Sequence, residues 1–199
     1  MQAAWPRRII LASRSPRRLE LARGRGWNVE VVAPPDEAEA AAPPRRPDEP
    51  LEHFVMRLAH AKAAAVHALG ARGTILACDT LGEVEGVVLG KPADAADARR
   101  MLEALAGRTH RVLTGVCLWP TEAGEPSQAW AESTLEMDHF APDFLGWYLA
   151  SGLWRGKAGA CGFQDERLPL RLLTGSASNV VGLPVELVEQ MLADLDHRG

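Results

Sequence analysis

The first residues suited to chemistry lie at an expected turn between a short apolar run and a helix. Ser13 and Ser15 follow apolar residues 9–12, and Arg17 and Arg18 come just after them. A strand-to-helix turn directs unpaired backbone N–H groups and the positive end of the helix dipole at one point, which favours an anion. Phosphate is therefore one expected ligand. A well-capped helix with solvated arginines is the other interpretation, and this segment alone leaves both open.

Carboxylates supply the second group of candidates. Asp79 directly follows the apolar residues 74–78 and precedes Thr80, so we expect it at the end of a strand, where α/β proteins place ligands. Such a carboxylate holds a divalent cation or accepts a proton from water, and an ordinary strand-ending turn is the alternative. Glu37 and Glu39, in a Pro-rich segment, would complete an oxygen-ligand set, although solvent exposure is the usual state of such side chains.

Lysine is scarce in this chain. Only Lys62, Lys91 and Lys157 are lysines among the 22 basic residues. An ammonium binds phosphate as a point charge, so each is a candidate phosphate ligand, with retention on a solvated surface as the alternative. Residues 86–91 imitate a phosphate-binding P-loop, but the two glycines are too close together, and Pro92 stands where that motif needs Ser or Thr.

The composition excludes several classes of protein. The 199 residues are 47% hydrophobic and 24% charged, which is typical of a globular protein with one domain or two small lobes. A net charge of −4 disfavours binding to nucleic acid. No apolar run reaches the roughly 18 residues of a membrane helix, and no secretory apolar region follows the first basic residues, so we expect a cytoplasmic protein. The spacing of the cysteines (Cys78, Cys117 and Cys161) favours reduced, buried thiols over a disulfide framework or a zinc site.

The elements that must position these residues follow from apolar periodicity. We expect strands over 8–12, 29–32, 74–78, 110–119, 128–140 and 168–173, a hairpin over 83–89 that turns near Gly86, and helices over 16–24, 51–69, 93–105, 142–150 and 184–195. Strands and helices mix without strict alternation, which predicts an α/β protein with a mixed sheet. His53, His60 and His67 recur along the helix over 51–69, about 10 Å apart. One zinc ion cannot bind all three, so we interpret them as a solvated face.

Taken together, these motifs resemble the Maf family of nucleoside triphosphate pyrophosphatases. The matching segments run in order along nearly the whole chain: residues 10–18, 36–37, 57–63, 79–80, 89–92, 105–110, 114–115, 156–160, 162–164, 175–176 and 178–184. Each is weak alone, but the ordered set is specific and includes all three lysines. The resemblance implies one domain over 1–199, an α/β protein with an elongated mixed β-sheet, flanking helices and two lobes around a central cleft (a Maf/ITPase-like fold).

The resemblance also implies an activity. A nucleoside triphosphate would be hydrolysed to the monophosphate and pyrophosphate with the help of Mg²⁺ or Mn²⁺. This hydrolysis would clear surplus or modified nucleotides. The family's proton acceptor falls on Asp79, and Glu37 and Asp79 are the expected metal ligands. Which of these two carboxylates binds the metal and which orients the water stays open. The expected phosphate ligands are Ser13, Ser15, Arg18, Lys62, Lys91 and Lys157.

Base preference follows from three positions in the members that prefer dTTP and UTP. These positions are Arg17, Thr80 and Gln164 here, so the chain is similar to the pyrimidine subgroup. An amide such as that of Gln164 both donates to and accepts from a uracil edge. The chain departs from the family's usual residues beside these positions, which leaves the reaction class intact and the exact base open; the departures are Cys78, Cys161, Phe163, Asp165 and Ala177.

Two other functions are compatible with a nucleotide-binding or phosphate-binding protein of this fold. A nucleotide-binding regulator of cell division or septum formation, with little catalysis, would be expected to lose the acidic residue or the phosphate lysines, yet Asp79, Lys62 and Lys91 are present. A phosphate-sugar enzyme on the same fold is less consistent with the pyrimidine-type residues. The expected partner is the nucleoside triphosphate substrate, with no nucleic acid and no membrane, and the family resemblance adds a homodimer.

Overall fold

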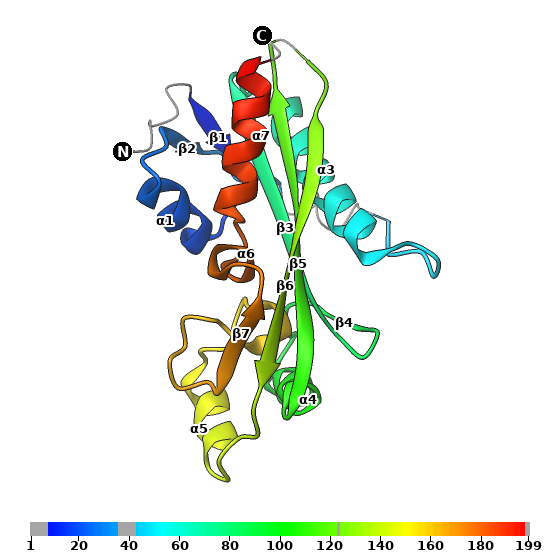
Figure 1. Cartoon of the computed structure of the whole chain (residues 1–199), viewed down its shortest axis with the longest axis vertical. Helices are drawn as coiled ribbons and strands as arrows, with labels where there is room; N and C mark the ends of the chain where they lie inside the picture. The colour runs from blue at the N-terminus through cyan, green and yellow to red at the C-terminus, as the bar shows by residue number, and fades with distance from the viewer. Residues whose placement is uncertain (1–7, 36–42, 123, 198–199) are drawn as a thin grey trace. The chain divides into compact units, whose positions relative to one another are not determined.

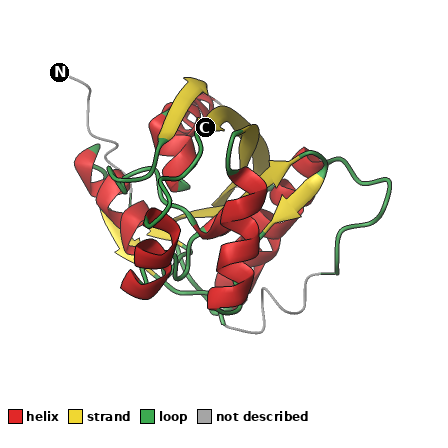
Figure 2. Cartoon of the chain, turned by 90° about the horizontal axis from the view of Figure 1, so that it is seen from below, coloured by secondary structure: helices red, strands yellow, loops and turns green. Residues whose placement is uncertain are grey.

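The structure is a computed structural model that describes residues 8–35, 43–122 and 124–197. The strands form one seven-stranded sheet in the order β2-β1-β3-β5-β6-β7, with β4 paired to β3 (Figure 1). Parallel and antiparallel pairs both occur, and helices flank the strands (Figure 2). The predicted mixed-sheet α/β class is therefore confirmed.

The elements, in chain order, are β1 (Ile9–Leu11), α1 (Pro16–Gly24), β2 (Val29–Val31), α3 (Leu51–Ala68), β3 (Thr74–Val84), β4 (Val87–Leu89), α4 (Ala95–Leu105), β5 (Arg108–Pro120), β6 (Ser127–Met137), α5 (Phe144–Ser151), the 3₁₀ turn η1 (Ala158–Ala160), β7 (Leu170–Thr174), α6 (Ala177–Val181) and α7 (Val185–His197). The chain divides into two compact units. Unit 1 comprises Met1–Asp79, Thr114–Ala131 and Gly182–Gly199, and unit 2 comprises Thr80–Leu113 and Glu132–Val181.

Unit 1 is built on the parallel strands β1, β2 and the first part of β3. Successive side chains of a strand point to opposite faces of the sheet. Ile9 and Leu11 of β1 accordingly join one apolar cluster, to which α1 and α7 contribute. Ile10 joins a second cluster, which is lined by α3. Each face of this part of the sheet thus has its own helical cover.

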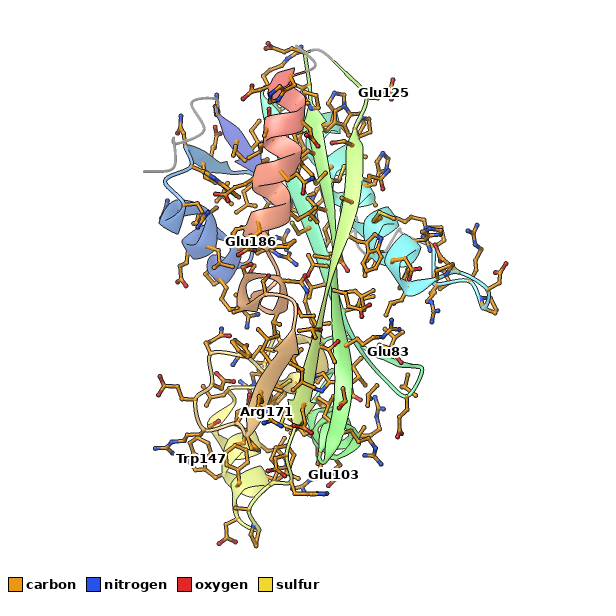
Figure 3. The ribbon with its side chains drawn as sticks, viewed as in Figure 1. Glu83, Glu103, Glu125, Trp147, Arg171 and Glu186 are labelled. Atoms are coloured by element: carbon orange, nitrogen blue, oxygen red, sulfur yellow. The ribbon has the colours of Figure 1, made fainter. Side chains whose placement is uncertain are left out.

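Unit 2 has a third apolar cluster, to which β3, β4, β6, α4 and α5 contribute. Its strands also carry cross-strand ion pairs. Arg111 of β5 donates to Glu83 of β3 at 2.8 Å and to Glu132 of β6 at 3.1 Å, and Arg171 of β7 pairs with Glu136 of β6. Figure 3 labels Glu83 and Arg171 on their strands. These charged side chains link neighbouring strands, as opposite charges on paired strands do.

The predicted elements are found within a few residues of their expected bounds, with one correction that concerns the candidate site. Asp79 does not end its strand, because β3 continues to Val84. Pairing with β4 in the predicted hairpin, with Gly82 opposite Leu89, extends the strand beyond the apolar run. The hairpin turns at Glu85 and Gly86, whose φ values of 51° and 81° are the positive pair that a type I′ turn requires. Asp79 therefore lies in the middle of a long strand.

The structure adds one helix and changes the interpretation of the histidines. The sequence does not predict the short helix α6. The histidine face of α3 is solvated at His53 and His67, but it is also a stacking surface. The rings of His60 and His67 stack on Trp119 of β5, with ring centroids 5.6 and 4.5 Å apart. An aromatic contact, and not solvent alone, therefore occupies this face.

The sequence also predicts reduced, buried cysteines and no membrane-spanning helix. All three cysteines are free, and burial raises the pKa of Cys117 and of Cys161 to about 12. This agrees with the expected reduced thiols. Among the helices of the described residues, none has the length and apolar character needed to cross a membrane.

Gly115 of β5 lies against the backbone of α3. A Cβ atom at this position would lie 2.3 Å from the carbonyl carbon and oxygen of Val55. We expect Gly115→Ala to lower the free energy of unfolding by about 3 kcal/mol, because the atoms in the way are backbone and overpacking forces α3 away from the sheet. Urea unfolding measures this change.

Gly146 is the matched control for that substitution. It lies in α5, and a Cβ atom there would meet nothing within 4 Å. We expect Gly146→Ala to stabilise the protein by about 0.5–1 kcal/mol through the lower helix propensity of glycine. Equal unfolding midpoints for the two alanine variants would contradict the close approach at Gly115.

Candidate active site

Lys62 and Asp79 form a shielded ion pair within unit 1. The Nζ of Lys62 donates to Oδ1 of Asp79 at 2.5 Å, and the side chains are only 7% and 13% exposed. Lys62 lies on the buried face of α3, because it shares that face with Val55, Ala59 and Val66 at helical spacing. A charged group this far from water needs an opposite charge beside it. The structure therefore brings two predicted site residues into direct contact.

The turn after β1 is organised by two serine side chains. Ser15 caps α1, since its Oγ accepts from the backbone N–H of Arg18 at 3.4 Å. The Oγ of buried Ser13 accepts from the backbone N–H of Ser15 at 3.1 Å and from Nη1 of Arg18 at 3.4 Å. Nε of Arg18 also donates to the carbonyl of Gly182 at 2.6 Å. The capped helix is confirmed, whereas phosphate binding at this turn stays a prediction.

The buried thiol of Cys78 links the turn to the ion pair. Burial raises the pKa of Cys78 to about 11, while the positive charges of Arg18 and Lys62 oppose that rise and the carboxylate of Asp79 adds to it. All three charged groups thus lie within electrostatic reach of one residue. In unit 1, an ammonium, a guanidinium and a carboxylate therefore all act on the thiol that precedes Asp79 in β3.

Of the remaining predicted residues that the structure describes, one lies in unit 1 and the others lie in unit 2: Arg17 in unit 1, and Thr80, Lys91, Lys157 and Gln164 in unit 2. Arg17, on the first turn of α1, is half-buried, as is Thr80, the residue after Asp79 in β3. In unit 2, Lys91 is exposed between β4 and α4, and Gln164 is exposed between η1 and β7. Lys157 differs from both, because its Nζ donates to Oδ2 of Asp165 at 2.5 Å. Glu37 lies outside the described residues.

The oxygen atoms of the candidate site residues decide whether these residues could bind a divalent cation. No group of three or more His, Cys, Asp and Glu side chains in the described ranges is arranged to hold a metal ion. Mg²⁺ commonly binds through one or two carboxylates, with substrate phosphates and water completing its shell. The carboxylate of Asp79 fits such a site, in which the protein supplies few ligands.

Sequence reasoning missed a second ion pair in unit 1, between a buried glutamate and a half-buried arginine. Glu49, buried just before α3, accepts from Nε and Nη2 of Arg57 at 2.9 and 2.8 Å. Arg57 also donates to the carbonyls of Pro43 and Pro44, so it fastens this segment to α3. The only signal in the sequence was that Arg57 belongs to one of the family-like segments. Nothing there identifies Glu49 as its partner.

The free energy of unfolding should depend on pH through the ion pair of Glu49 and Arg57. Hydrogen bonds from Arg57 lower the pKa of Glu49 from 4.5 to about 2. A carboxyl with a lower pKa in the folded state stabilises the fold fully above its unfolded pKa and loses that effect as the pH falls. We expect the stability difference between the wild-type protein and Glu49→Gln to shrink from pH 4.5 to pH 2. Urea unfolding across this range checks it, and a constant difference would contradict the assignment.

A second polar network in unit 2 was also not anticipated. Nδ2 of the buried Asn179 donates to the carbonyl of Val112 at 3.1 Å and to Oγ of Ser133 at 2.9 Å. Ser133 exchanges two hydrogen bonds with the backbone of Ser176. The network fixes the segment before α6 to β5 and β6. Residues 175–176 and 178–184 are family-like in sequence, but the sequence does not indicate these contacts.

Comparison with known proteins supports the family suggested by the sequence. The Maf family, described as "Maf-like protein", matches residues 8–195. A Rhodopirellula baltica protein named dTTP/UTP pyrophosphatase is 39% identical over 192 residues, which is 96% of this chain and 83% of that protein. Proteins of the same name from Symbiobacterium thermophilum and Pyrococcus abyssi are 41% and 36% identical, over 95% and 92% of this chain and 94% of each relative.

A solved structure supports the fold. The structure of a HAM1 protein from Coxiella burnetii matches with a TM-score of 0.50 and 18% sequence identity, and the match covers 96% of this chain and 98% of the other. At this identity the likeness concerns the fold alone. The family match over most of the chain and the relatives at 36–41% identity lead to one conclusion: the chain belongs to the Maf family.

Proposed function

We propose that the protein hydrolyses a nucleoside triphosphate to the nucleoside monophosphate and pyrophosphate. The observation that carries this proposal is the shielded Lys62–Asp79 ion pair in a chain of the Maf family. It places an acidic group beside a fixed positive charge, which suits a reaction on a polyanion. The curated relatives described above are named dTTP/UTP pyrophosphatases, which supports the same reaction.

The roles we assign to unit 1 follow from charge. Asp79 accepts the proton of the attacking water, whose oxygen forms a bond to the α-phosphorus. The bond between the α-phosphorus and the bridging oxygen breaks, and pyrophosphate leaves with that electron pair. Lys62 and Arg18 offset the negative charge of the phosphates and the charge that develops during this step. Ser13 and Ser15 hold the turn from which Arg18 projects.

A divalent cation, Mg²⁺ or Mn²⁺, is part of the proposal. When bound, such an ion neutralises charge on the phosphate oxygens. Asp79 would hold it from β3, and Glu37, outside the described residues, is the second carboxylate that we assign to it.

Base preference is the finer part of the proposal. We assign preference for dTTP and UTP to Arg17, Thr80 and Gln164, and phosphate binding to Lys91. The names of the relatives support pyrimidine substrates. We also include a cytoplasmic location and a homodimer, and the family resemblance is the support for the homodimer. A nucleotide-binding regulator without catalysis is not favoured, since those relatives are named as enzymes.

The test is pyrophosphate release from dTTP, UTP, CTP, the purine triphosphates and 7-methyl-GTP, with Mg²⁺ or Mn²⁺ and with a chelator. We expect release that is fastest with dTTP and UTP and is abolished by the chelator. A different preferred base would contradict the roles of Arg17, Thr80 and Gln164 while keeping the reaction. Folded protein that releases pyrophosphate from no triphosphate would contradict the reaction itself.

A further inference from the structure

The segment between α5 and β7 in unit 2 is held by backbone turns and by a group of buried and half-buried side chains. Over residues 152–169 its regular structure is limited to the 3₁₀ turn η1. Within it, Nζ of Lys157 donates to Oδ2 of Asp165 at 2.5 Å, and the two side chains are 12% and 11% exposed. An ion pair at such low exposure holds both side chains in one place, because separating them would leave two shielded charges unpaired.

Tyr148 adds a second donor to the same carboxylate. It is the single tyrosine of the chain and is 0% exposed in the core of unit 2. Its hydroxyl donates to Oδ2 of Asp165 at 2.6 Å. A buried hydroxyl requires a partner, so this bond ties Asp165 to α5. One carboxylate oxygen thus accepts from a neutral and from a charged donor. We call Tyr148, Lys157 and Asp165 the carboxylate clamp.

The clamp closes a turn that carries Gln164. The N–H of Asp165 donates to the carbonyl of Gly162 at 2.9 Å, and the N–H of Leu168 donates to the carbonyl of Asp165 at 2.8 Å. The side chain of Lys157 lies along Gly162, since a Cβ atom there would lie 2.8 Å from Nζ. The backbone on both sides of the exposed Gln164 is therefore held by Lys157 and Asp165.

The segment is also fastened on either side of this turn. The guanidinium of Arg167 lies 4.7 Å from the ring centroid of Trp147, which Figure 3 labels on α5. At the other side, the N–H of Gly159 donates to the carbonyl of Gly90 at 3.0 Å, next to Lys91. The turn at Gln164 is thus held by its own backbone hydrogen bonds, and the clamp adds the side-chain bonds that tie Asp165 to Tyr148 and Lys157.

We propose that Asp165 is a positioning residue that fixes the turn bearing Gln164, and that Lys157 serves Asp165 and does not bind the triphosphate. The inference rests on the proposed function, in which Gln164 contacts the base. A side-chain amide donates on one side and accepts on the other, and it matches uracil or cytosine according to its orientation. A fixed backbone limits the orientations that this amide adopts, and so it favours one base over the other.

Charge and exposure support the inference that Lys157 does not bind the triphosphate. Lys157 and Asp165 together carry no net charge, so the pair attracts a polyanion weakly. A phosphate would have to displace a carboxylate that already contacts the ammonium at 2.5 Å. Lys91 is exposed between β4 and α4. The contact with the carboxylate is what assigns Lys157 to Asp165 and not to the triphosphate.

The test compares kcat/KM for UTP and CTP in Asp165→Ala, Lys157→Met and Gln164→Ala, with Glu166→Gln as the control at the exposed neighbouring acid. We expect the UTP-to-CTP ratio to fall at least tenfold in the first three variants and to stay at the wild-type value in the control. Asp165→Asn, which keeps an acceptor oxygen, should recover part of the ratio. Adding Asp165→Ala to Gln164→Ala should lower the ratio no further.

A phosphate-binding lysine would give a different result. Lys157→Met would then lower kcat/KM for UTP and CTP by the same factor and leave their ratio unchanged, as we expect for Lys91→Met. That outcome would overturn the assignment of Lys157.

A measurement without nucleotide separates this inference from the proposed function. Hydrogen exchange at the amides of Asp165 and Leu168 should be at least tenfold faster in Asp165→Ala and in Lys157→Met, and unchanged in Glu166→Gln and at the amides of α4. Unchanged exchange in the first two variants would overturn the positioning role whatever the activity. A wild-type protein that hydrolyses no triphosphate but shows this exchange pattern would contradict the proposed function alone.

Discussion

Replacing Asp79 by asparagine is expected to lower the rate of pyrophosphate release by about 10²–10⁴-fold, the contribution typical of a general base. Asparagine keeps the size of the side chain and an acceptor oxygen for Lys62, but it does not take a proton from water and carries no charge to offset the ammonium. The loss should appear in kcat, because the proton is transferred during the chemical step. Steady-state kinetics with UTP and dTTP measure it.

Asp143→Asn is the matched control for this substitution. Asp143 is exposed at the start of α5 and its side chain caps no backbone group there. We expect wild-type kinetics from it, and near-ultraviolet circular dichroism verifies that both variants are folded. Near-wild-type release from Asp79→Asn would remove Asp79 from the mechanism.

The second large effect is expected at Lys62. Lys62→Met should lower kcat/KM by about 10²–10³-fold, the loss typical of removing one preorganised electrostatic contact. It should also lower the free energy of unfolding by about 3 kcal/mol or more, because the shielded carboxylate of Asp79 loses its counter-charge. Kinetics and urea unfolding of the same preparation separate the two losses.

The double variant Lys62→Met/Asp79→Leu separates stability from function at this pair. Replacing a buried ion pair by apolar side chains of similar volume is often neutral or stabilising. We therefore expect the double variant to be more stable than Lys62→Met and to remain inactive. A double variant less stable than the single one would contradict the ion pair as drawn, and substantial activity in it would contradict the proposed chemistry.

The sequence was sufficient for the fold class and for most elements, because apolar periodicity and caps are local signals. Ser15 as the cap of α1 and the turn at Gly86 were both predictable from local chemistry. The end of β3 was not, because its second part is held by pairing with β4 and not by an apolar run. Pairing between strands is a tertiary property, and so Asp79 was placed at a strand end that does not exist.

The candidate site was predictable as a set of residue types and not as a set of partners. The scarcity of lysine identified Lys62 and Lys157 equally, yet one meets Asp79 on β3 and the other meets Asp165. Which carboxylate a lysine meets depends on how the chain turns and packs between the two residues, and no spacing in the sequence encodes it. Glu49 was missed for the same reason, since its partner Arg57 lies two turns along α3.

The reaction is tested most directly by hydrolysis of UTP in ¹⁸O-labelled water, with mass spectrometry of both products. Attack at the α-phosphorus predicts one ¹⁸O atom in the nucleoside monophosphate and none in pyrophosphate. Label in pyrophosphate would place the attack at the β-phosphorus. Nucleoside diphosphate with orthophosphate as products would show cleavage at the γ-phosphate, and either result would contradict the proposed reaction.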